Sequence, residues 1–386
     1  MHEIPKGWKV KKLGEICILD KGKIENCGEL PYLEVKFLRN LKNADIKEKG
    51  IVVEKNQAVI LVDGENSGEV FKVKTKGYLG STFRILKLSD NVNFDYFIFF
   101  MNFVSLKFKN SKVGSAIPHL NKKLFNECEI PLPNLVEQKA IADKLDDSFA
   151  KIENAITNLI NTKENLKLYK QSVLKSAFNG DLLPNTSPTH WEVKKLGEIF
   201  NVIGGGTPNT NNAEFWGGNI SWISSADIDK ENFNAIPRKF ITENAIQNSA
   251  TNLVPKNTII VVTRVGLGKV AITKEPMCFS QDSQALIPFE KINVKFMAYQ
   301  IKQIAQNFIN ISRGTTINGI TKQNLKDCKI CVPPLSEQNL IVAEIDRRFA
   351  IVDKTLNLID KNIQNAKNLK QSILKKAFSG ELRSEI

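Results

Sequence analysis

The feature that most constrains this chain is an internal repeat. The decapeptide QSVLKSAFNG at 171–180 returns as QSILKKAFSG at 371–380, and from Pro133 onward residues recur 200 positions later without a gap. Near the N-terminus, GWKVKKLGEI (7–16) matches HWEVKKLGEI (190–199) at an offset of 183. The two offsets differ by 17 residues, which is the length of an insertion in the second copy. A repeat of this length predicts one structural unit written twice.

Each copy has two parts with different hydrophobic periodicity. The first part contains short runs typical of strands, such as AVILV, FRILKL, TIIVVTRV and QALIPF, separated by Gly, Asn and Pro. The second part repeats apolar residues at spacings of three and four, which predicts a long amphipathic helix. The predicted helix–helix interface consists of Ile141, Leu145, Phe149, Ile152, Ile156, Leu159, Leu166, Val173, Ile341, Ile345, Phe349, Val352, Leu356, Ile359, Ile363 and Ile373.

We expect the two long helices to pair with each other. Forty-odd residues at a rise of 1.5 Å make a helix of about 60 Å, and an apolar stripe of that length needs a partner. A pseudo-two-fold relation between the copies makes the pairing antiparallel. The alternative is that each helix packs on its own domain and the two separate at the linker LLPNTSPTH.

The predicted fold class is therefore α+β. Two mixed domains of helix and strand are separated by two long helices that pair as an antiparallel coiled coil, with a pseudo-two-fold internal repeat. The predicted segments are a first domain (1–136), a first helix (137–180), a linker (181–190), a second domain (191–336), a second helix (337–380) and a tail (381–386).

The charge of the chain favours a polyanionic partner. Its formal net charge is +13, and the largest shares lie in the two domains: 22 basic against 16 acidic residues in 1–136, and 16 against 12 in 181–336. Nucleic acid is the commonest polyanion that such a surplus attracts. Many Lys-rich proteins are basic without binding nucleic acid, so charge alone leaves both interpretations open.

Metal and membrane signals are weak. The chain has six cysteines, and its one CxxC, Cys328 to Cys331, lacks a nearby second pair or histidines, so we predict a strand there and no metal site. No apolar run reaches the roughly 18 residues of a membrane span. The N-terminus lacks the apolar core of a signal peptide. We therefore expect no membrane association and a cytoplasmic location.

Motifs of catalysis are mostly missing. There is no GxxxxGK[ST] phosphate loop, RVGLGKV (264–270) lacks a third glycine, and VPPL lacks the polar first residue of the tetrapeptide of adenine methyltransferases. With three histidines in the chain, a Ser/His/Asp site is disfavoured. LEVK (33–36) with Asp20 matches part of a metal-dependent nuclease pattern, but the second copy has WISS there. The pattern favours a chain without a catalytic site.

Taken together, these motifs resemble a known family. The sequence is similar to specificity subunits of type I restriction-modification systems over essentially its whole length. The resemblance is carried by the two entrance motifs, by GGGTPNTNNAEFWGGNISWISSADI (204–228), by PLPNLVEQ and VPPLSEQ before the helices, and by the two decapeptides. One departure is that VGSAIPHLN (113–121) is a looser version of RGTTINGIT (313–321).

The resemblance implies a function and a set of partners. Each domain would be a target recognition domain that reads one half of a bipartite, asymmetric site in double-stranded DNA, and the paired helices would set the gap between the halves. Two methyltransferase subunits would dock on this core, and motor-nuclease subunits would join through them. S-adenosylmethionine, ATP and Mg would bind to those partners, so this chain would bind no cofactor and catalyse no reaction.

Candidate DNA contacts follow from residue type, since Lys and Arg bind phosphates while Arg, Asn, Gln and Lys read bases. The candidates are Lys36, Arg39, Lys42, Lys112, Ser115 and Lys122 in the first copy, and Thr207, Asn209, Asn211, Trp216, Arg238, Lys239, Arg264, Lys269, Arg313 and Thr315 in the second. A competing hypothesis is a structural coiled-coil scaffold whose two domains bind proteins rather than DNA. Salt separates the two, because binding to several phosphates weakens steeply with ionic strength.

Overall fold

The computed structural model describes residues 5–111, 113, 118–184, 188–312 and 319–382. The chain forms two compact units, one of Met1–Thr162 with Leu358–Ile386 and the other of Lys163–Asn357. Both boundaries fall inside the long helices α5 (Leu135–Asn179) and α10 (Leu335–Ser379). Each unit therefore contains one domain and part of each helix, whereas the sequence-based division treated the helices as segments of their own.

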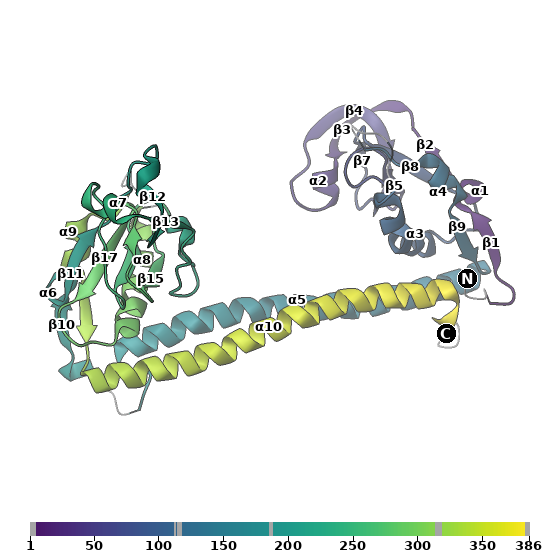
Figure 1. The fold of residues 1–386 in the computed structure, drawn as a ribbon. Helices are drawn as coiled ribbons and strands as arrows, with labels where there is room; N and C mark the ends of the chain where they lie inside the picture. Colours follow the sequence, from purple (N-terminus) through teal and green to yellow (C-terminus); the bar gives the residue numbers. More distant parts are fainter. Residues whose placement is uncertain (1–4, 112, 114–117, 185–187, 313–318, 383–386) are drawn as a thin grey trace. The chain divides into compact units, whose positions relative to one another are not determined.

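Unit 1 is built on a four-stranded antiparallel sheet with the strand order β2-β8-β5-β6. A second group, β3, β4 and β7, pairs in all three combinations, and β1 pairs with β9. The strands are β1 (Lys9–Lys12), β2 (Cys17–Asp20), β3 (Ile24–Leu33), β4 (Ile46–Val53), β5 (Ala58–Leu61), β6 (Val70–Lys72), β7 (Gly77–Leu79), β8 (Phe83–Leu88) and β9 (Glu129–Leu132). The shorter helices are α1 (Leu13–Ile16), α2 (Val35–Leu38), α3 (Phe94–Lys109) and α4 (Lys122–Glu127). Figure 1 shows α3 between the sheet and the paired helix segments of this unit.

Unit 2 repeats this plan with the sheet order β11-β17-β14-β15. A second sheet has the order β13-β12-β16, and β10 pairs with β18. The strands are β10 (Glu192–Lys195), β11 (Phe200–Gly204), β12 (Trp216–Ile223), β13 (Lys239–Ile241), β14 (Ile259–Val262), β15 (Val270–Ile272), β16 (Cys278–Phe279), β17 (Ser283–Pro288) and β18 (Lys329–Val332). The helical elements are η1 (Pro188–His190), α6 (Leu196–Ile199), η2 (Ala213–Phe215), η3 (Ser225–Asp227), α7 (Glu243–Gln247), α8 (Val294–Ser312) and α9 (Lys322–Asp327).

The two units differ where the second copy carries its insertion. The segment that joins β2 to β3 in unit 1 spans 21–23, and the equivalent segment that joins β11 to β12 in unit 2 spans 205–215. The longer segment contains η2 and leads into β12, which lies with α7 at the end of unit 2 farthest from its helix segments (Figure 1). The insertion therefore enlarges the part of the domain that is remote from the helices.

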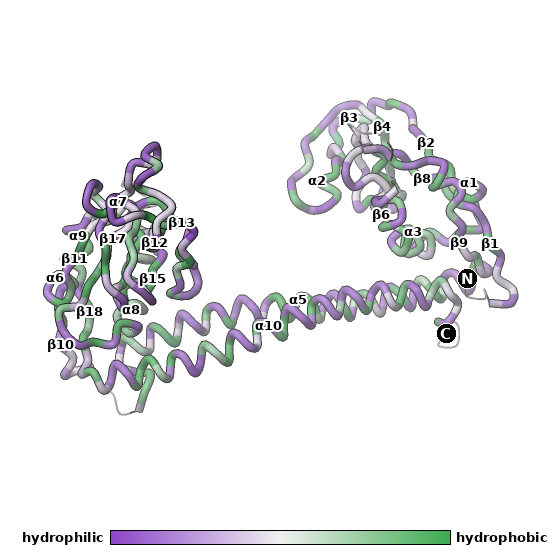
Figure 2. Tube along the Cα trace, viewed as in Figure 1, coloured by the Kyte–Doolittle hydropathy of each residue, from purple (hydrophilic) through white to green (hydrophobic). Residues whose placement is uncertain are grey.

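The long helices begin and end with the residues that the repeat singled out. Asn134 caps α5, because its Oδ1 accepts a hydrogen bond from the backbone N–H of Glu137 at 3.0 Å. Gly180 and Gly380 follow the two helices with φ of 81° and 82°, the left-handed conformation that closes a helix with glycine. Every residue of the predicted helix–helix interface is buried or half-buried, and Figure 2 shows polar and apolar residues alternating along both helices.

The two helices run antiparallel. In unit 1 the start of α5, with Ile141 and Leu145, shares a core with Leu374 and Phe378 near the end of α10. In unit 2 the end of α5 shares a core with the start of α10, as Val173 packs with residues such as Ile341 and Ile345. Opposite ends meet in both units, which confirms the predicted pairing. Each helix also packs at its start on its own domain and at its end on the domain of the other copy. The alternative in which the two helices separate at the linker is therefore wrong, although each helix does contact its own domain.

The entrance motifs are tied to the helix starts by tryptophan. Trp8 Nε1 donates to Glu137 Oε1 at 2.9 Å, and Trp191 Nε1 donates to Glu337 Oε2 at 3.0 Å. In unit 2, His190 Nε2 lies 2.7 Å from the other oxygen of Glu337. The repeated sequence motifs therefore mark one repeated contact, which fixes the first strand of each copy to its long helix.

Within the described residues, no helix combines the length and the apolarity that crossing a membrane requires.

Candidate nucleic-acid interface

One edge of the four-stranded sheet collects loops in both units, and we call it the loop edge. In unit 2, β11 and β14 end there and β17 and β15 begin there, so segments 205–207, 280–282 and 263–269 lie together. The N–H of Ile320 joins them by donating to Thr263 O at 2.8 Å. In unit 1 the segments are 21–23, 80–82 and 62–69, and the N–H of Leu120 donates to Val62 O at 2.8 Å. Loops on a rigid scaffold are where binding residues concentrate.

The glycines of the GGGT sequence bring one segment of the unit 2 loop edge against its neighbour. A Cβ added to Gly205 would lie 2.2 Å from Ser280 O, and one added to Gly206 would lie 2.4 Å from backbone atoms of Ala250. The backbone is fastened there, as Gly206 N donates to Phe279 O at 2.9 Å and Trp222 Nε1 donates to Gly206 O at 3.1 Å. No other residue type permits so close an approach.

Thr207 follows this hydrogen-bonded backbone, and its side chain contacts a residue that is not among the predicted DNA contacts. Its hydroxyl Oγ1 donates a hydrogen bond to Oε1 of Gln281, and both side chains are exposed. Gln281 lies in the turn between β16 and β17. The only sequence signal for it is the polar run SQDSQ (280–284) between two apolar runs.

The insertion of unit 2 is anchored by aromatic residues. The ring of Trp216 packs edge-on against Trp222 with 5.4 Å between centroids, and its Nε1 donates to Asn209 O at 3.1 Å. Asn209 Oδ1 accepts from the backbone N–H of Asn211 at 3.0 Å. Lys239 Nζ lies 5.3 Å from the centre of the Trp216 ring, within cation–π range. Four of the predicted contact residues therefore form one patch.

The predicted basic residues of unit 2 also stabilise loops. Arg238 Nε lies 3.4 Å from Asp227 Oδ1 and Arg264 Nε lies 4.0 Å from Asp282 Oδ1, yet their side chains stay 73% and 61% exposed. Lys269 Nζ donates to the backbone oxygen of Ser225 at 2.7 Å and is half-buried. Arg238 and Arg264 thus keep donors for a phosphate, whereas Lys269 holds η3 against the loop edge.

In unit 1 the predicted residues gather around α2. The guanidinium of Arg39 bonds to Glu69 in the β5–β6 turn, which raises the pKa of Arg39. Lys42 pairs with Asp45 at 2.8 Å and with Glu34 at 3.4 Å, and the hydrogen bond to Asp45 raises the pKa of Lys42. Lys36 on α2 is exposed. Arg39 and Lys42 therefore remain charged at neutral pH.

The two loop edges differ in charge. Asp63, Glu65 and Glu69 of unit 1 stand where unit 2 has Thr263, Val265 and Lys269, at the repeat offset of 200. Asp63 is held by a contact of 2.7 Å between its Oδ1 and Nδ1 of His119. The two loop edges therefore differ in charge at three equivalent positions, while segment 21–23 of unit 1 adds Lys21 and Lys23.

The remaining predicted contacts divide into one that the structure places and four that it does not. Lys122 is exposed at the start of α4, two residues after Leu120, whose N–H reaches the loop edge. The other candidates, Lys112, Ser115, Arg313 and Thr315, lie outside the described residues.

Two alternative chemistries find little support in the geometry. The nuclease-like carboxylates both pair with lysines, Asp20 with Lys87 at 2.5 Å and Glu34 with Lys42. Cys328 and Cys331 are free and half-buried, and burial raises the pKa of the Cys328 thiol. Among the described residues, no three His, Cys, Asp or Glu side chains form a group that could hold a metal ion.

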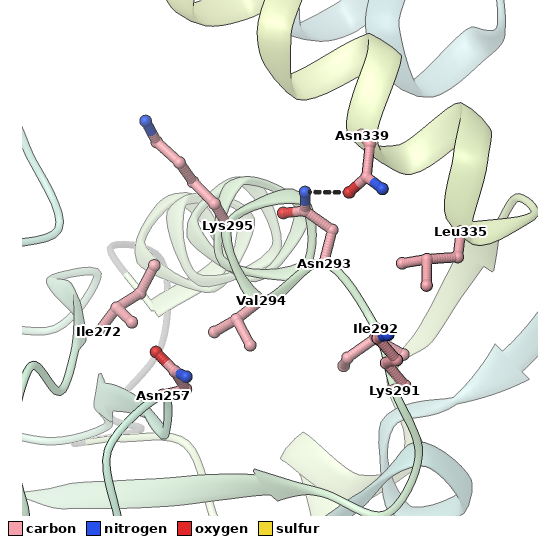
Figure 3. A pocket seen from close by; sticks show the side chains of 9 residues that line it. All are labelled: Asn257, Ile272, Lys291, Ile292, Asn293, Val294, Lys295, Leu335 and Asn339. Atoms are coloured by element: carbon pink, nitrogen blue, oxygen red, sulfur yellow. Dashed lines mark hydrogen bonds between the residues drawn. The ribbon is translucent and has the colours of Figure 1, made fainter.

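An open pocket of about 410 Å³ lies at the opposite end of the unit 2 sheet, between α8 and the start of α10. Figure 3 shows Asn293 bonded to Asn339 across it, at 2.8 Å between Nδ2 and Oδ1. Lys295 on its rim pairs with Asp346 at 2.6 Å. The lining residues are Asn257, Ile272, Lys291, Ile292, Asn293, Val294, Lys295, Leu335 and Asn339. The pocket is therefore part of the seam between domain and helix, away from the loop edge.

This geometry defines a class of protein. Two related domains present differently charged loop edges, and each is fixed to a shared pair of antiparallel helices. A chain of this kind has the architecture of a bipartite recognition module.

The comparisons with known proteins give the family. The family model described as type I restriction modification DNA specificity domain matches residues 5–162 and 188–367, so the chain belongs to this family. The type I restriction enzyme MjaVIII specificity subunit of Methanocaldococcus jannaschii is 27% identical over 425 residues, covering 99% of this chain and 95% of that protein. The EcoR124I/EcoR124II specificity subunit of Escherichia coli is 31% identical over 254 residues, covering 62% and 60%.

Solved structures share the fold. A chain of a type I R-M system, studied for its complex assembly and conformational transition, superposes with a TM-score of 0.79 at 19% identity, over 98% of this chain and 99% of that one. The HsdS subunit from Thermoanaerobacter tengcongensis superposes with a TM-score of 0.62 at 19% identity, over 98% of each chain. The predicted α+β fold with two long helices is confirmed, and the chain is a DNA specificity subunit by family.

Proposed function

We propose that each domain of this chain reads one half of a bipartite, asymmetric DNA sequence through its loop edge. The observation that carries this proposal is the pair of loop edges at equivalent places in two copies of one fold, with different charges and with the insertion beside one of them. A shared frame explains why one subunit serves two half-sites. Different loop residues explain why the half-sites differ in sequence.

The proposed DNA contacts are exposed cations and amides described above. Arg238, Arg264 and Lys239 in unit 2, and Lys36 and Lys122 in unit 1, supply positive charge for phosphates. Asn209 and Asn211 supply amides that can bond to base edges. Because several phosphates would be neutralised, binding should weaken steeply as salt is raised.

We further propose that the chain itself catalyses no reaction and binds no cofactor. Two methyltransferase subunits would dock on the paired helices, and motor-nuclease subunits would join the complex through them. S-adenosylmethionine, ATP and Mg would then belong to those partners. We expect the complex to act in the cytoplasm. The repeat supports this stoichiometry, because two equivalent frames offer two identical partners the same surface.

The test is to express the chain with a cognate methyltransferase subunit in a host that lacks adenine methylation, and to map modified adenines by single-molecule sequencing. The expected result is one bipartite sequence with two defined segments and an unspecified gap, and no methylation when this chain is omitted. Methylation with the same sequence in its absence contradicts the proposal. A control without the methyltransferase tests whether this chain modifies DNA alone.

A further inference from the structure

The Gln281 amide is oriented by its neighbour. The amide of glutamine has an oxygen that accepts two hydrogen bonds and a nitrogen that donates two. The Thr207 hydroxyl occupies one acceptor position of Oε1, which fixes which side of the amide carries the oxygen. Oε1 keeps a second acceptor position and Nε2 keeps its two hydrogens, so the amide can still bind one ligand through both atoms. Together they form an edge that offers one acceptor and one donor.

The orienting hydroxyl is itself held in place. Thr207 follows Gly206, whose N–H and carbonyl are both bonded, to Phe279 and Trp222 respectively. The turn that carries Gln281 is also fastened, as Ser280 N donates to Ile223 O at 2.9 Å and Ser283 N donates to Ser280 O at 3.1 Å. A recognition group held by rigid backbone loses little freedom on binding, which favours specificity.

The surroundings of Gln281 suit a nucleic acid. The next residue, Asp282, has its carboxylate beside the guanidinium of Arg264, so it does not present an isolated negative charge to DNA. The exposed guanidinium of Arg264 lies at the same loop edge and can bind a phosphate. Among the bases, adenine offers an N6 donor beside the N7 acceptor in the major groove, which matches the edge of an oriented glutamine amide.

We infer that Gln281 is a specificity-determining residue of unit 2 that reads an adenine in its half-site, with Thr207 as its positioning residue. The inference rests on the proposed function. Nε2 donates to N7 of the adenine and Oε1 accepts from its N6, while the Thr207 hydroxyl keeps the amide from turning over. At the equivalent position unit 1 has Ser81, which carries no amide. The same readout is therefore absent from that half-site.

The experiment selects sequences from a randomised pool of double-stranded DNA with the full-length chain. With the wild type we expect two enriched segments. With Gln281→Ala we expect one position, an A·T pair in a single segment, to lose preference by roughly 5- to 150-fold, the discrimination of one bidentate contact. With Gln281→Glu, which only accepts, we expect that position to change towards C·G.

Positioning is tested separately. Thr207→Val removes the hydroxyl at nearly constant volume and should weaken preference at the same position, whereas Thr207→Ser should retain it. Ser81→Ala in unit 1 is the matched control and should leave this segment unchanged. Circular dichroism verifies that each variant is folded, as expected for substitutions of exposed side chains.

The outcomes are distinct. Unchanged preferences with Gln281→Ala, an equal loss at all positions, or a wild-type preference for another base at the affected position each overturn the assignment of Gln281 to adenine while leaving the proposed function intact. If the wild-type chain enriches no sequence at all, the proposed function fails and this inference fails with it.

Discussion

At the scale of single residues, the glutamine of VEQ and SEQ is repeated in the sequence and makes equivalent hydrogen bonds in both units. Gln138 and Gln338 are 1% and 2% exposed. Each accepts from a backbone N–H before the domain helix, that of Asn93 at 2.7 Å and that of Asn293 at 2.9 Å. Each also donates to a proline carbonyl just before the long helix, that of Pro133 and that of Pro333, both at 2.8 Å. One side chain thus joins a long helix to its domain.

Replacing this glutamine should therefore destabilise the fold. Gln138→Leu leaves buried backbone groups without partners, at about 1–3 kcal/mol for each group, so we expect the free energy of unfolding to fall by about 2 kcal/mol or more. Gln338→Leu should cost less, because Gln138 makes an additional bond to Asn91 O at 3.1 Å. Urea unfolding followed by circular dichroism measures both. The exposed neighbour Lys139→Ala is the control, and an equal effect of control and variant contradicts the assigned role.

At the scale of elements, a lysine near the end of each helix reaches a phenylalanine and an acid near the start of the other. In unit 2, Lys170 Nζ lies 4.9 Å from the centre of the Phe349 ring and 2.5 Å from Asp353 Oδ1. In unit 1, Lys370 Nζ lies 4.9 Å from the Phe149 ring and pairs with Glu153. These contacts specify which residues face each other and so favour one antiparallel register.

We expect Lys370→Ala to lower the free energy of unfolding by about 1 kcal/mol, since it removes a cation–π contact and a partly exposed ion pair. Part of the loss should disappear at high salt, which screens the ion pair. The control is Lys375→Ala, an exposed lysine in the same helix. Thermal unfolding at low and high salt gives the comparison. A loss in the control as large as in Lys370→Ala would argue against this contact.

At the scale of the whole molecule, the repeat links two recognition domains through one pair of helices. Phe378 of α10 packs against Tyr96 and Phe100 of the first domain at 5.2 Å between ring centroids. In unit 2, Phe178 of α5 packs on Phe296 of the second domain at 5.7 Å. Each domain is therefore attached to both helices, so a change in helix length is expected to act on the spacing of the two half-sites.

Lengthening both helices together should lengthen the unspecified gap. Insertion of seven residues after Thr162 in α5 and after Asn357 in α10 adds two turns and preserves the apolar stripe. The added rise of about 10 Å corresponds to about 3 base pairs. Methylation mapping with the variant should find the original half-sites farther apart. An unchanged gap would exclude a role of the helices in spacing.

Exchanging one domain should change one half-site. We expect replacement of residues 200–330 by the matching segment of another family member to alter the sequence of a single segment and to leave the other and the gap unchanged. The same mapping of modified adenines measures this result. A change in both half-sites would mean that the domains do not read DNA independently.

Much of the architecture could be predicted because it depends on local periodicity. The spacing of Ile141, Leu145 and Ile345 alone predicts helix, and the repeat predicts equivalent contacts in the two copies. The candidate site was less predictable. Thr207 was selected for its place in a polar insertion, but its partner Gln281 lies 74 positions further along. Such pairs depend on which strands become neighbours, and propensity carries no information about that.

The sequence by itself determined that this protein is one unit written twice with two long helices, and it favoured their antiparallel pairing, because an apolar stripe of that length needs a partner. It also identified the family through the order of its motifs. Only the tertiary structure decided that the decapeptide ends pack on the domain of the opposite copy, and that Thr207 orients Gln281. Both depend on contacts between segments far apart in the chain, which form when antiparallel pairing and close backbone approach at glycine bring those segments together.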